Sequence, residues 1–298
     1  MPTKDIGLLS FYIASDEGFF AQEGLDVSLQ GMASQAAIPA LSSKQVQFAT
    51  GGSAARAAYQ GAPLRVVMYA YQTYVFYGVG NKDVKSYQDL KGKTIGISSA
   101  SASDDVITHL LLQKENIALS SVQLLPLGSG PDRYKALLAG QIQFSALNPD
   151  IAVQLQTQGF NILGPLNDLF PVPSAGFAVH TDTIAQQPDM LRSWLRASVK
   201  GLQFMKSNPS AAADVAAKEF QLDSAVAQQA VKLTLPAVSD SDPGGITESA
   251  LTLSTKADLD ALKLSADPAE LGKKVTDFQP LRQAQRDLGI HCTGGYEC

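Results

Sequence analysis

The sequence predicts an α/β protein built from two similar lobes. A chain of 298 residues has the length of about two domains. In addition, a nine-residue pattern occurs twice, 96 residues apart: Ala-Leu-Ser-Ser-Lys-Gln-Val-Gln-Phe at 40–48 and Ala-Leu-Leu-Ala-Gly-Gln-Ile-Gln-Phe at 136–144. Because only two copies exist and the period is too long for a solenoid, we interpret them as two lobes.

The first copy has the pattern of alternating strands and helices. Short apolar runs predict strands at 6–9, 25–29, 46–50 and 64–70, and amphipathic stretches predict helices at 14–22, 35–43 and 54–60. This alternation favours mainly parallel sheets flanked by helices. Asp-Ile-Gly-Leu-Leu-Ser at 5–10 is similar to Thr-Ile-Gly-Ile-Ser-Ser at 94–99, so the strand at 6–9 is expected to correspond to one at 94–97.

The second copy repeats the order, and long helices follow it. Strands are predicted at 94–97, 122–126, 142–146 and 160–163, with helices at 104–115, 131–139 and 151–157. A returning strand is predicted at 176–180, and helices at 190–206, 210–220, 224–235 and 247–262. We therefore predict that residues 1–77 and 181–298 form lobe one, and residues 78–180 form lobe two.

Charge and hydropathy exclude two classes of protein. The formal net charge is −5 and no run of basic residues occurs, which argues against a nucleic-acid partner. No stretch supplies the 18 or so consecutive apolar residues of a membrane-spanning helix. Charged residues make up only 17% of the chain, so we expect recognition to depend on neutral hydrogen bonds more than on ion pairs.

The two cysteines, Cys292 and Cys298, lie together near the end of the sequence. A disulfide closing a small loop is the favoured interpretation, and it implies an oxidising compartment. Two free thiols, or a surface metal site with His291, are the alternatives, although the spacing does not match the usual zinc sites. The first residues lead straight into an apolar run, and we expect a targeting segment to have been removed.

The candidate site follows from the fold class. In parallel α/β sheets, ligands bind where loops leave the carboxyl ends of the strands. Serine hydroxyls and amides at the starts of the following helices could hold an anion, although Ser53 and Ser103 could equally be helix caps. Arg133 could pair with a carboxylate or sulfonate, or be a solvated surface charge. The proposed ligand-binding residues are Ser10, Phe11, Tyr12, Gly51, Gly52, Ser53, Tyr71, Ser99, Ser101, Ser103, Arg133, Asn148, Asp150 and Ser174.

Signatures of catalysis are few. The histidines at 109, 180 and 291 are far apart, and no nucleophile-elbow spacing occurs. Gly92-Lys-Thr94 is similar to the end of a phosphate-binding loop, but Tyr87 stands where the first glycine belongs. We predict that the protein is not an enzyme and needs no cofactor or metal.

Three motifs resemble those of a known family, the periplasmic solute-binding proteins of the nitrate, sulfonate, taurine and thiamine-precursor type. They are Ala-Ser-Asp-Glu-Gly-Phe-Phe-Ala-Gln-Glu-Gly-Leu-Asp-Val at 14–27, the stretch 40–52, and Tyr-Gln-Asp-Leu-Lys-Gly-Lys-Thr-Ile-Gly at 87–96. The sequence departs from the second motif in two ways. Lys44 stands where glycine is usual, although the second copy of the pattern has this glycine as Gly140. Gln47 and Gln143 stand where aspartate is common. The cysteine-rich motif of the fungal pyrimidine-synthesising relatives is missing.

The resemblance implies a two-lobed periplasmic-binding-protein fold with the ligand cleft between the lobes. It also implies an extracytoplasmic receptor, a monomer free in the periplasm or lipid-anchored, that delivers a small molecule to the membrane permease of an ABC importer. We expect a small organic anion, a carboxylate or sulfonate, held by closure of the lobes, with Tyr12 and Phe11 flanking its body. Alternatives are a thiamine-pyrimidine-like heteroaromatic ligand, since Asp150 also points toward the cleft, or a lyase for small carboxylates with Asp150 or His180 as base. A transcription regulator's effector domain would need further DNA-binding helices.

Overall fold

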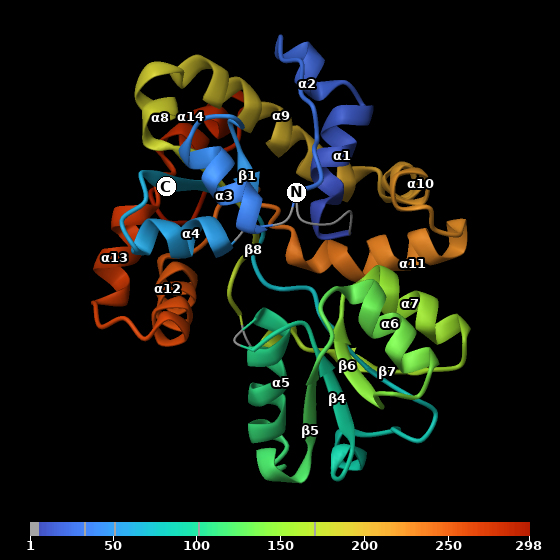
Figure 1. The fold of residues 1–298 in the computed structure, drawn as a ribbon. Coiled ribbons are helices and arrows are strands. Elements are labelled where there is room, and N and C mark those ends of the chain that lie inside the picture. The colour runs from blue at the N-terminus through green and yellow to red at the C-terminus, as the bar shows by residue number, and fades with distance from the viewer. Residues whose placement is uncertain (1–5, 33, 51, 101, 170) are drawn as a thin grey trace. The chain divides into compact units, whose positions relative to one another are not determined.

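The computed structural model describes residues 6–32, 34–50, 52–100, 102–169 and 171–298 (Figure 1). The chain divides into two compact units. Unit 1 comprises Met1–Thr73, Val172–Gln221 and Leu235–Cys298, and unit 2 comprises Tyr74–Pro171 and Leu222–Thr234. The sequence-based division placed all of 181–298 in lobe one, whereas the structure groups Leu222–Thr234 with unit 2.

Unit 1 has a three-stranded sheet in the order β1-β8-β2. Its strands are β1 (Ala49–Thr50), β2 (Leu64–Tyr71) and β8 (Ser174–His180). Both β1 and β2 pair antiparallel with β8, which lies between them. The expectation of parallel pairing is wrong for this sheet, because the returning strand β8 inserts between the two strands of the first copy.

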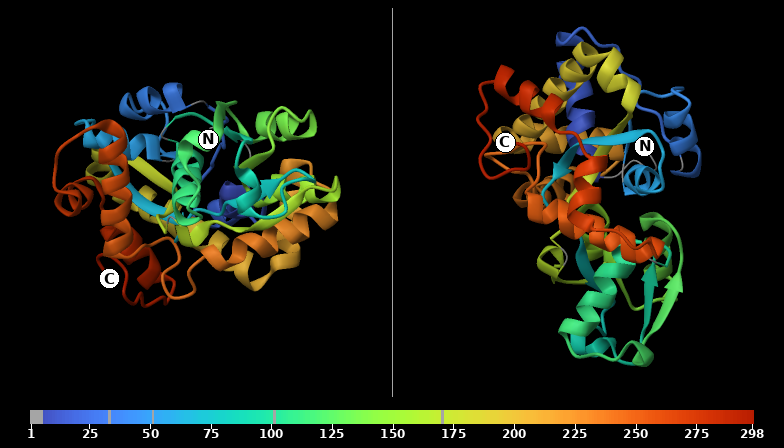
Figure 2. Two further views of the ribbon diagram at one scale, coloured as in Figure 1. Left: turned by 90° about the horizontal axis from the view of Figure 1, so that it is seen from below. Right: turned by 90° about the vertical axis from the view of Figure 1, so that its left-hand side faces the viewer.

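Helices surround this sheet (Figures 1 and 2). They are the 3-10 helices η1 (Ile6–Leu8) and η5 (Leu235–Ala237), and α1 (Leu9–Asp16), α2 (Phe19–Gln22), α3 (Ser34–Ser42), α4 (Gly52–Tyr59), α8 (Thr181–Gln186), α9 (Pro188–Ser207), α10 (Pro209–Phe220), α12 (Glu248–Leu262), α13 (Pro268–Val275) and α14 (Gln279–Asp287). The long helix α9 packs on α1, where Gly201 lets the two backbones approach. A Cβ at Gly201 would collide with the carbonyl oxygen of Ser10.

Unit 2 has a five-stranded sheet in the order β5-β4-β6-β3-β7. Its strands are β3 (Tyr77–Gly80), β4 (Thr94–Ile97), β5 (Gln123–Pro126), β6 (Phe144–Leu147) and β7 (Asn161–Pro165). β4 runs parallel to β5 and β6, and β3 runs antiparallel to β6 and β7. The helices of unit 2 are η2 (Tyr87–Leu90), η3 (Leu119–Ser121), η4 (Asn167–Leu169), α5 (Ser103–Lys114), α6 (Gly130–Leu138), α7 (Pro149–Thr157) and α11 (Ser224–Thr234).

The internal repeat is present in the structure at the spacing of 96 residues. A shift of 96 carries α3 onto α6, β1 onto β6, α4 onto α7 and β2 onto β7, within three residues at every end. The antiparallel set β1-β8-β2 thus has the same order as β6-β3-β7.

Two predicted strands in the first copy are wrong. Residues 6–9 begin a helix, formed by η1 and the start of α1, and residues 25–29 lie outside any strand. The match of 5–10 with 94–99 had suggested a strand, but it uses a spacing of 89. At the spacing of 96, the segment 7–18 corresponds to α5, which explains why it is helical.

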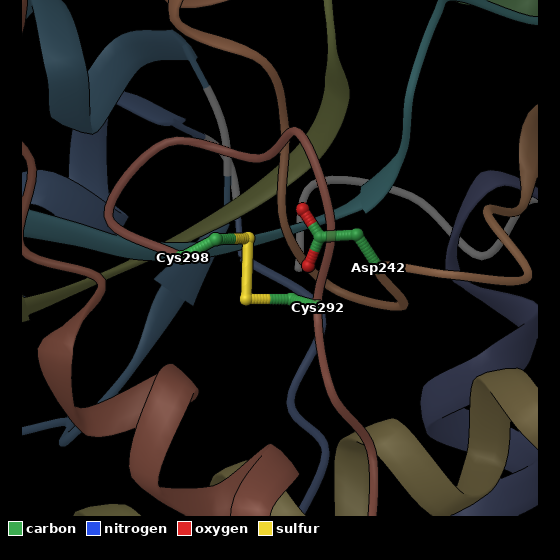
Figure 3. A group of neighbouring side chains, drawn as sticks. All are labelled: Asp242, Cys292 and Cys298. Carbon is green, nitrogen blue, oxygen red and sulfur yellow. A yellow bond between two sulfur atoms is a disulfide. The ribbon is translucent and has the colours of Figure 1, made fainter.

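A disulfide closes the C-terminal tail into a loop (Figure 3), and Arg282 of a buried ion pair with Asp242 donates to the Tyr296 carbonyl of that loop at 3.0 Å. Cys292 and Cys298 form the disulfide, and the Asp242 carboxylate lies beside it. That carboxylate accepts hydrogen bonds from Arg282, which is 1% exposed, and from Gln285 Nε2 at 2.8 Å. Because metals bind thiolates and not disulfide sulfurs, this group is a structural contact and not a metal site.

None of the described helices combines the length and the apolar character that crossing a membrane requires.

Candidate functional site

The strand-end edge of unit 2 is formed by the carboxyl ends of β4 and β6. Because these strands are parallel, Ser98 after β4 and Asn148 after β6 lie at the same edge. α5 begins at Ser103 and α7 begins at Pro149, so both helix starts lie at this edge. The predicted residues Ser99, Ser103, Asn148 and Asp150 are therefore brought together; Ser99 is exposed, Asp150 is 6% exposed, and Ser101 lies outside the described residues.

A carboxylate of the protein itself occupies the hydroxyl-rich loop of this edge. Asp104, in the first turn of α5, accepts a hydrogen bond from the Ser98 amide at 2.6 Å and another from the Ser98 hydroxyl. A negative group at a helix start is stabilised by the free amides and the helix dipole. The loop predicted to hold an anionic ligand thus already holds the anion Asp104.

Arg133, on α6, is the buried cation of this edge. Its Nη1 donates to Asp104 Oδ2 at 3.0 Å, to Ser145 Oγ at 3.2 Å and to the carbonyl oxygen of Ala146 at 2.7 Å. Burial lowers the pKa of the Arg133 guanidinium, and the charge of Asp104 raises it. Arg133 is 6% exposed, so the alternative of a solvated surface charge is wrong. Its proposed pairing with a ligand stays a prediction, since the structure shows it paired with Asp104.

An aromatic pair stands beside the same edge. Tyr74 and Phe76 are half-buried and stack with ring centroids 5.4 Å apart and planes 5° apart. They precede β3, whose first residue Tyr77 pairs with Leu147, the last residue of β6. Both residues belong to a run of aromatic side chains at 71–77, and from the sequence we had expected Tyr74 and Phe76 to be packing residues and not ligand contacts.

The corresponding edge of unit 1 is less polar. Ser53 lies in the first turn of α4, half-buried, and follows Gly52, the first residue of that helix; Gly51 lies outside the described residues. The register of β2 with β8 places Tyr71 opposite Ser174 at this edge. The Ser174 hydroxyl donates to the Thr73 carbonyl at 3.1 Å, and the buried Tyr71 hydroxyl donates to the Ile6 carbonyl at 3.2 Å.

Three predicted contacts of unit 1 lie in its core. Residues 10–13, which we expected to form a loop between a strand at 6–9 and a helix at 14–22, are part of α1, and Ser10, Phe11 and Tyr12 are each less than 7% exposed. Phe11 stacks on Trp194 with centroids 5.7 Å apart, and Tyr12 meets the ring of Phe220 edge-on at 5.4 Å. In the structure these side chains stabilise the packing of α1, and contact with a ligand stays a prediction for them.

A groove of about 410 Å³ in unit 1 was not predicted from the sequence. Its sides are two stretches of chain, 25–30 and 45–50. Its lining also includes the aromatic side chains of Phe11, Phe177 and Trp194. Phe48 stacks on Trp194 with centroids 4.0 Å apart and planes 13° apart. We call this feature the unit 1 groove.

The histidines that were weighed as bases have structural partners. His180 Nδ1 accepts the amide of Asp182 at 3.1 Å, so it caps α8. His180 pairs with Leu64 at the opposite end of β8 from Ser174, away from the strand-end edge of unit 1. His109 pairs with Asp105 at 3.2 Å on α5.

Comparison with known proteins decides the family. A family model described as NMT1/THI5 like matches residues 6–212, more than half of the chain. The chain belongs to the NMT1/THI5-like family. The riboflavin-binding protein RibY of Chloroflexus aurantiacus is 27% identical over 246 residues, which are 78% of this chain and 69% of RibY.

Solved structures with the same fold include both binding proteins and an enzyme. The alkanesulfonate-binding protein SsuA of Xanthomonas axonopodis pv. citri, bound to MOPS, has a TM-score of 0.70 and 16% identity, covering 91% of this chain and 95% of SsuA. The desulfurization enzyme DSZB has a TM-score of 0.69 and 15% identity, covering 94% and 96%. At these identities the likeness shows the fold, which is the periplasmic-binding-protein fold expected from the sequence.

Proposed function

We propose that this NMT1/THI5-like protein is an extracytoplasmic solute-binding receptor of an ABC importer whose ligand is a neutral or weakly cationic aromatic heterocycle. The main support for this ligand class is that Arg133, the buried cation at the strand-end edge of unit 2, is already paired with Asp104. Breaking that pair to bind a ligand anion would leave Asp104 buried without its counter-charge, which is costly.

The polar and aromatic groups of this edge suit such a ring. Because Arg133 balances the charge of Asp104, Asp150 is the carboxylate that gives the edge negative charge, which disfavours an anion and favours hydrogen-bond donors on the ligand. The stacked pair Tyr74 and Phe76 offers a half-exposed aromatic surface for a planar ring. The resemblance to RibY, named as riboflavin-binding, supports the same ligand class.

A small organic anion is the second candidate, favoured by the hydroxyls and helix starts at 98–103 and 52–53 and by the sulfonate-binding fold relative. The two candidates separate in a calorimetric titration of the purified protein with riboflavin, thiamine, taurine and MOPS. Saturable binding of riboflavin or thiamine alone supports the heterocycle. Binding of taurine or MOPS alone overturns it.

The aromatic pair provides the residue-level test. Tyr74→Ala should weaken binding of the heterocycle by up to about tenfold, because a ring stack contributes roughly 0.5–1.5 kcal/mol. Tyr74→Phe is the matched control, since it keeps the ring, and its affinity should stay within about twofold of the parent. If Tyr74→Ala binds as tightly as the parent, the pair does not form part of the site.

A receptor and an enzyme differ in what they do to the bound molecule. Mass spectrometry after incubation with stoichiometric ligand should recover the ligand unchanged, and a new product would support an enzyme of the kind represented by DSZB. Delivery to a membrane permease and closure of the lobes on the ligand are further parts of the proposal. Small-angle scattering tests closure, because the ligand should then lower the radius of gyration.

A further inference from the structure

The loop at 292–298, which we call the tail loop, covers the buried ion pair of Asp242 with Arg282. Its two cysteines form the disulfide that closes it, and the Asp242 carboxylate lies beside that bond (Figure 3). Gly295, inside the loop, lies against the pair: a Cβ there would collide with a carboxylate oxygen of Asp242 and lie 2.9 Å from Arg282 Nη2. Asp242 is 4% exposed and Arg282 is 1% exposed. The tail loop therefore helps to exclude water from this pair.

The Arg282 guanidinium makes five hydrogen bonds, and two of them go to the tail loop. Its Nη1 donates to Asp242 and, at 2.9 Å, to Gln285 Oε1, and its Nη2 donates to Asp242 Oδ2 at 3.3 Å. The Tyr296 carbonyl accepts the other two, from Nε at 3.0 Å and from Nη2. A buried donor of a charged group that loses its acceptor is costly. The ion pair is therefore most stable while the tail loop stays closed.

The tail loop also bonds two neighbouring parts of unit 1. The Tyr296 amide donates to the Ile246 carbonyl at 2.7 Å. The Glu297 carboxylate accepts the amide of Phe278, directly before α14, at 2.8 Å. Ile246 is the last residue of a buried segment, 242–246, that begins with the aspartate of the ion pair. The tail loop thus fastens this segment to the start of α14.

The segment 242–246 in turn covers the outer edge of β2. One edge of β2 pairs with β8. Beyond the other edge, the Gly244 carbonyl accepts the Tyr69 amide at 2.8 Å. Gln72, directly after β2, donates through its side chain to the Gly245 carbonyl. The last residues of β2 belong to the strand-end edge of unit 1, so a continuous series of hydrogen bonds leads from the tail loop to that edge.

We propose that the tail loop is a redox-sensitive strap, which holds the segment 242–246 on β2 while its disulfide is intact and releases it when a dithiol reductant opens the bond. The two thiols of the reductant become a disulfide and give two electrons and two protons to the bond between Cys292 and Cys298, which leaves two cysteine thiols. Cys298 is exposed and Cys292 is half-buried, so a small thiol has access to the bond. Without the cross-link, the opened loop gains conformational freedom.

The test is amide hydrogen exchange of the oxidised protein and of the protein reduced with dithiothreitol. Reduction should accelerate exchange at the Tyr296 amide by at least about tenfold. It should accelerate exchange at the Tyr69 amide by at least about threefold, because the segment that covers it is released. The Thr181 amide, bonded to the Pro63 carbonyl at 2.9 Å next to the opposite end of β2, should keep its rate.

Two sets of variants separate the strap from the chemistry of the sulfurs. Combined Cys292→Ser and Cys298→Ser should give the exchange rates of the reduced protein, with no response to dithiothreitol. Gly295→Ala should accelerate exchange at Tyr69 in the oxidised protein, because the added Cβ displaces the loop from the ion pair while the disulfide remains. Thr293→Ala is the matched control, since Thr293 is an exposed residue of the same loop, and it should leave exchange at Tyr69 unchanged.

Two results would overturn the proposal. One is an unchanged rate at Tyr69 in the reduced parent, which would show that the effect of the tail loop ends before β2. The other is equal acceleration at Tyr69 and Thr181, which would make the disulfide a general stabiliser of unit 1 and not a strap on one edge. No ligand enters these measurements, so failure here leaves the proposed function standing.

Discussion

The two units share the order α3-β1-α4-β2 and α6-β6-α7-β7, but they differ in what lies beneath their strand ends. In unit 2 the buried set is polar: Arg133, Asp104 and Ser145. At the spacing of 96 their counterparts in unit 1 are Ala37, Leu8 and Ala49. Equivalent positions of the repeat therefore hold an ion pair in unit 2 and apolar side chains in unit 1. Of the two arrangements, only the ion pair can discriminate between charged ligands.

Removing the cation should give the largest loss. Arg133→Met leaves Asp104 buried without its partner, so we expect the free energy of unfolding in urea to fall by about 3–5 kcal/mol. Combining it with Asp104→Leu, which approaches the apolar arrangement of unit 1, should recover most of that loss. If the double variant is no more stable than Arg133→Met, the apolar arrangement does not transfer between the units.

The matched phenylalanines of the repeat should differ in their contribution. Phe144 is fully buried, and Phe144→Ala should cost about 3–5 kcal/mol. Phe48 is half-buried beside the groove, so Phe48→Ala should cost about half as much. Thermal or urea unfolding of both variants measures this difference. Equal losses would mean that the groove leaves Phe48 as well packed as Phe144.

Lys44 and Gly140 occupy equivalent turns with positive φ, at 64° and 71°. A side chain is strained in this conformation, so Gly140→Ala should cost about 1 kcal/mol. Lys44→Gly should gain up to about that amount, reduced by the loss of the exposed ion pair with Asp182, which contributes about 0–1 kcal/mol. Chemical denaturation of the two variants checks the opposite signs, and a destabilised Lys44→Gly would contradict the argument.

Acid should have a smaller effect, which can be followed at α14 in unit 1. Hydrogen bonding to Arg192 lowers the pKa of Asp287 to about 2, from an ordinary 3.8. The unfolded chain therefore binds more protons in this range, and stability should fall as the pH drops from about 4 toward 2. Amide exchange in α14 should accelerate over that window. In Asp287→Asn the acceleration should be absent, and its persistence would assign the effect to another group.

The sequence predicted the repeat and most elements of unit 2 because both follow from local patterns. The strand at 94–97 was predicted with the bounds that the structure gives, and the helices at 35–43 and 54–60 agree within two residues. The prediction of a strand at 6–9 was wrong because the hexamer at 5–10 matched 94–99 at a spacing of 89, whereas the repeat has a spacing of 96. A strand also needs a neighbour, and the run at 25–29 has none among the described residues.

The candidate site was harder to predict, because its polar groups meet only in the folded chain. Asp104 and Arg133 are 29 residues apart, and no local pattern shows that one neutralises the other. The burial of Ser10 and Tyr12 depends on α9 and α10, which follow them by more than 170 residues. The rule that ligands bind at the carboxyl ends of parallel strands located the edge in unit 2. It did not show that Asp104 and Arg133 fill that edge, because this depends on side-chain contacts in the folded chain.

The interleaving of the units has a consequence for biosynthesis. The chain passes from one unit to the other at 73/74, 171/172, 221/222 and 234/235. Unit 2 lacks α11, which packs on α7 and accepts the Tyr77 hydroxyl at Leu233, until residue 234 has been made. At about 5–20 residues per second, the ribosome adds the stretch from 171 to 234 in about 3–13 seconds. During that interval the face of α7 that α11 later covers is exposed on the nascent chain, and a holding chaperone could bind to it.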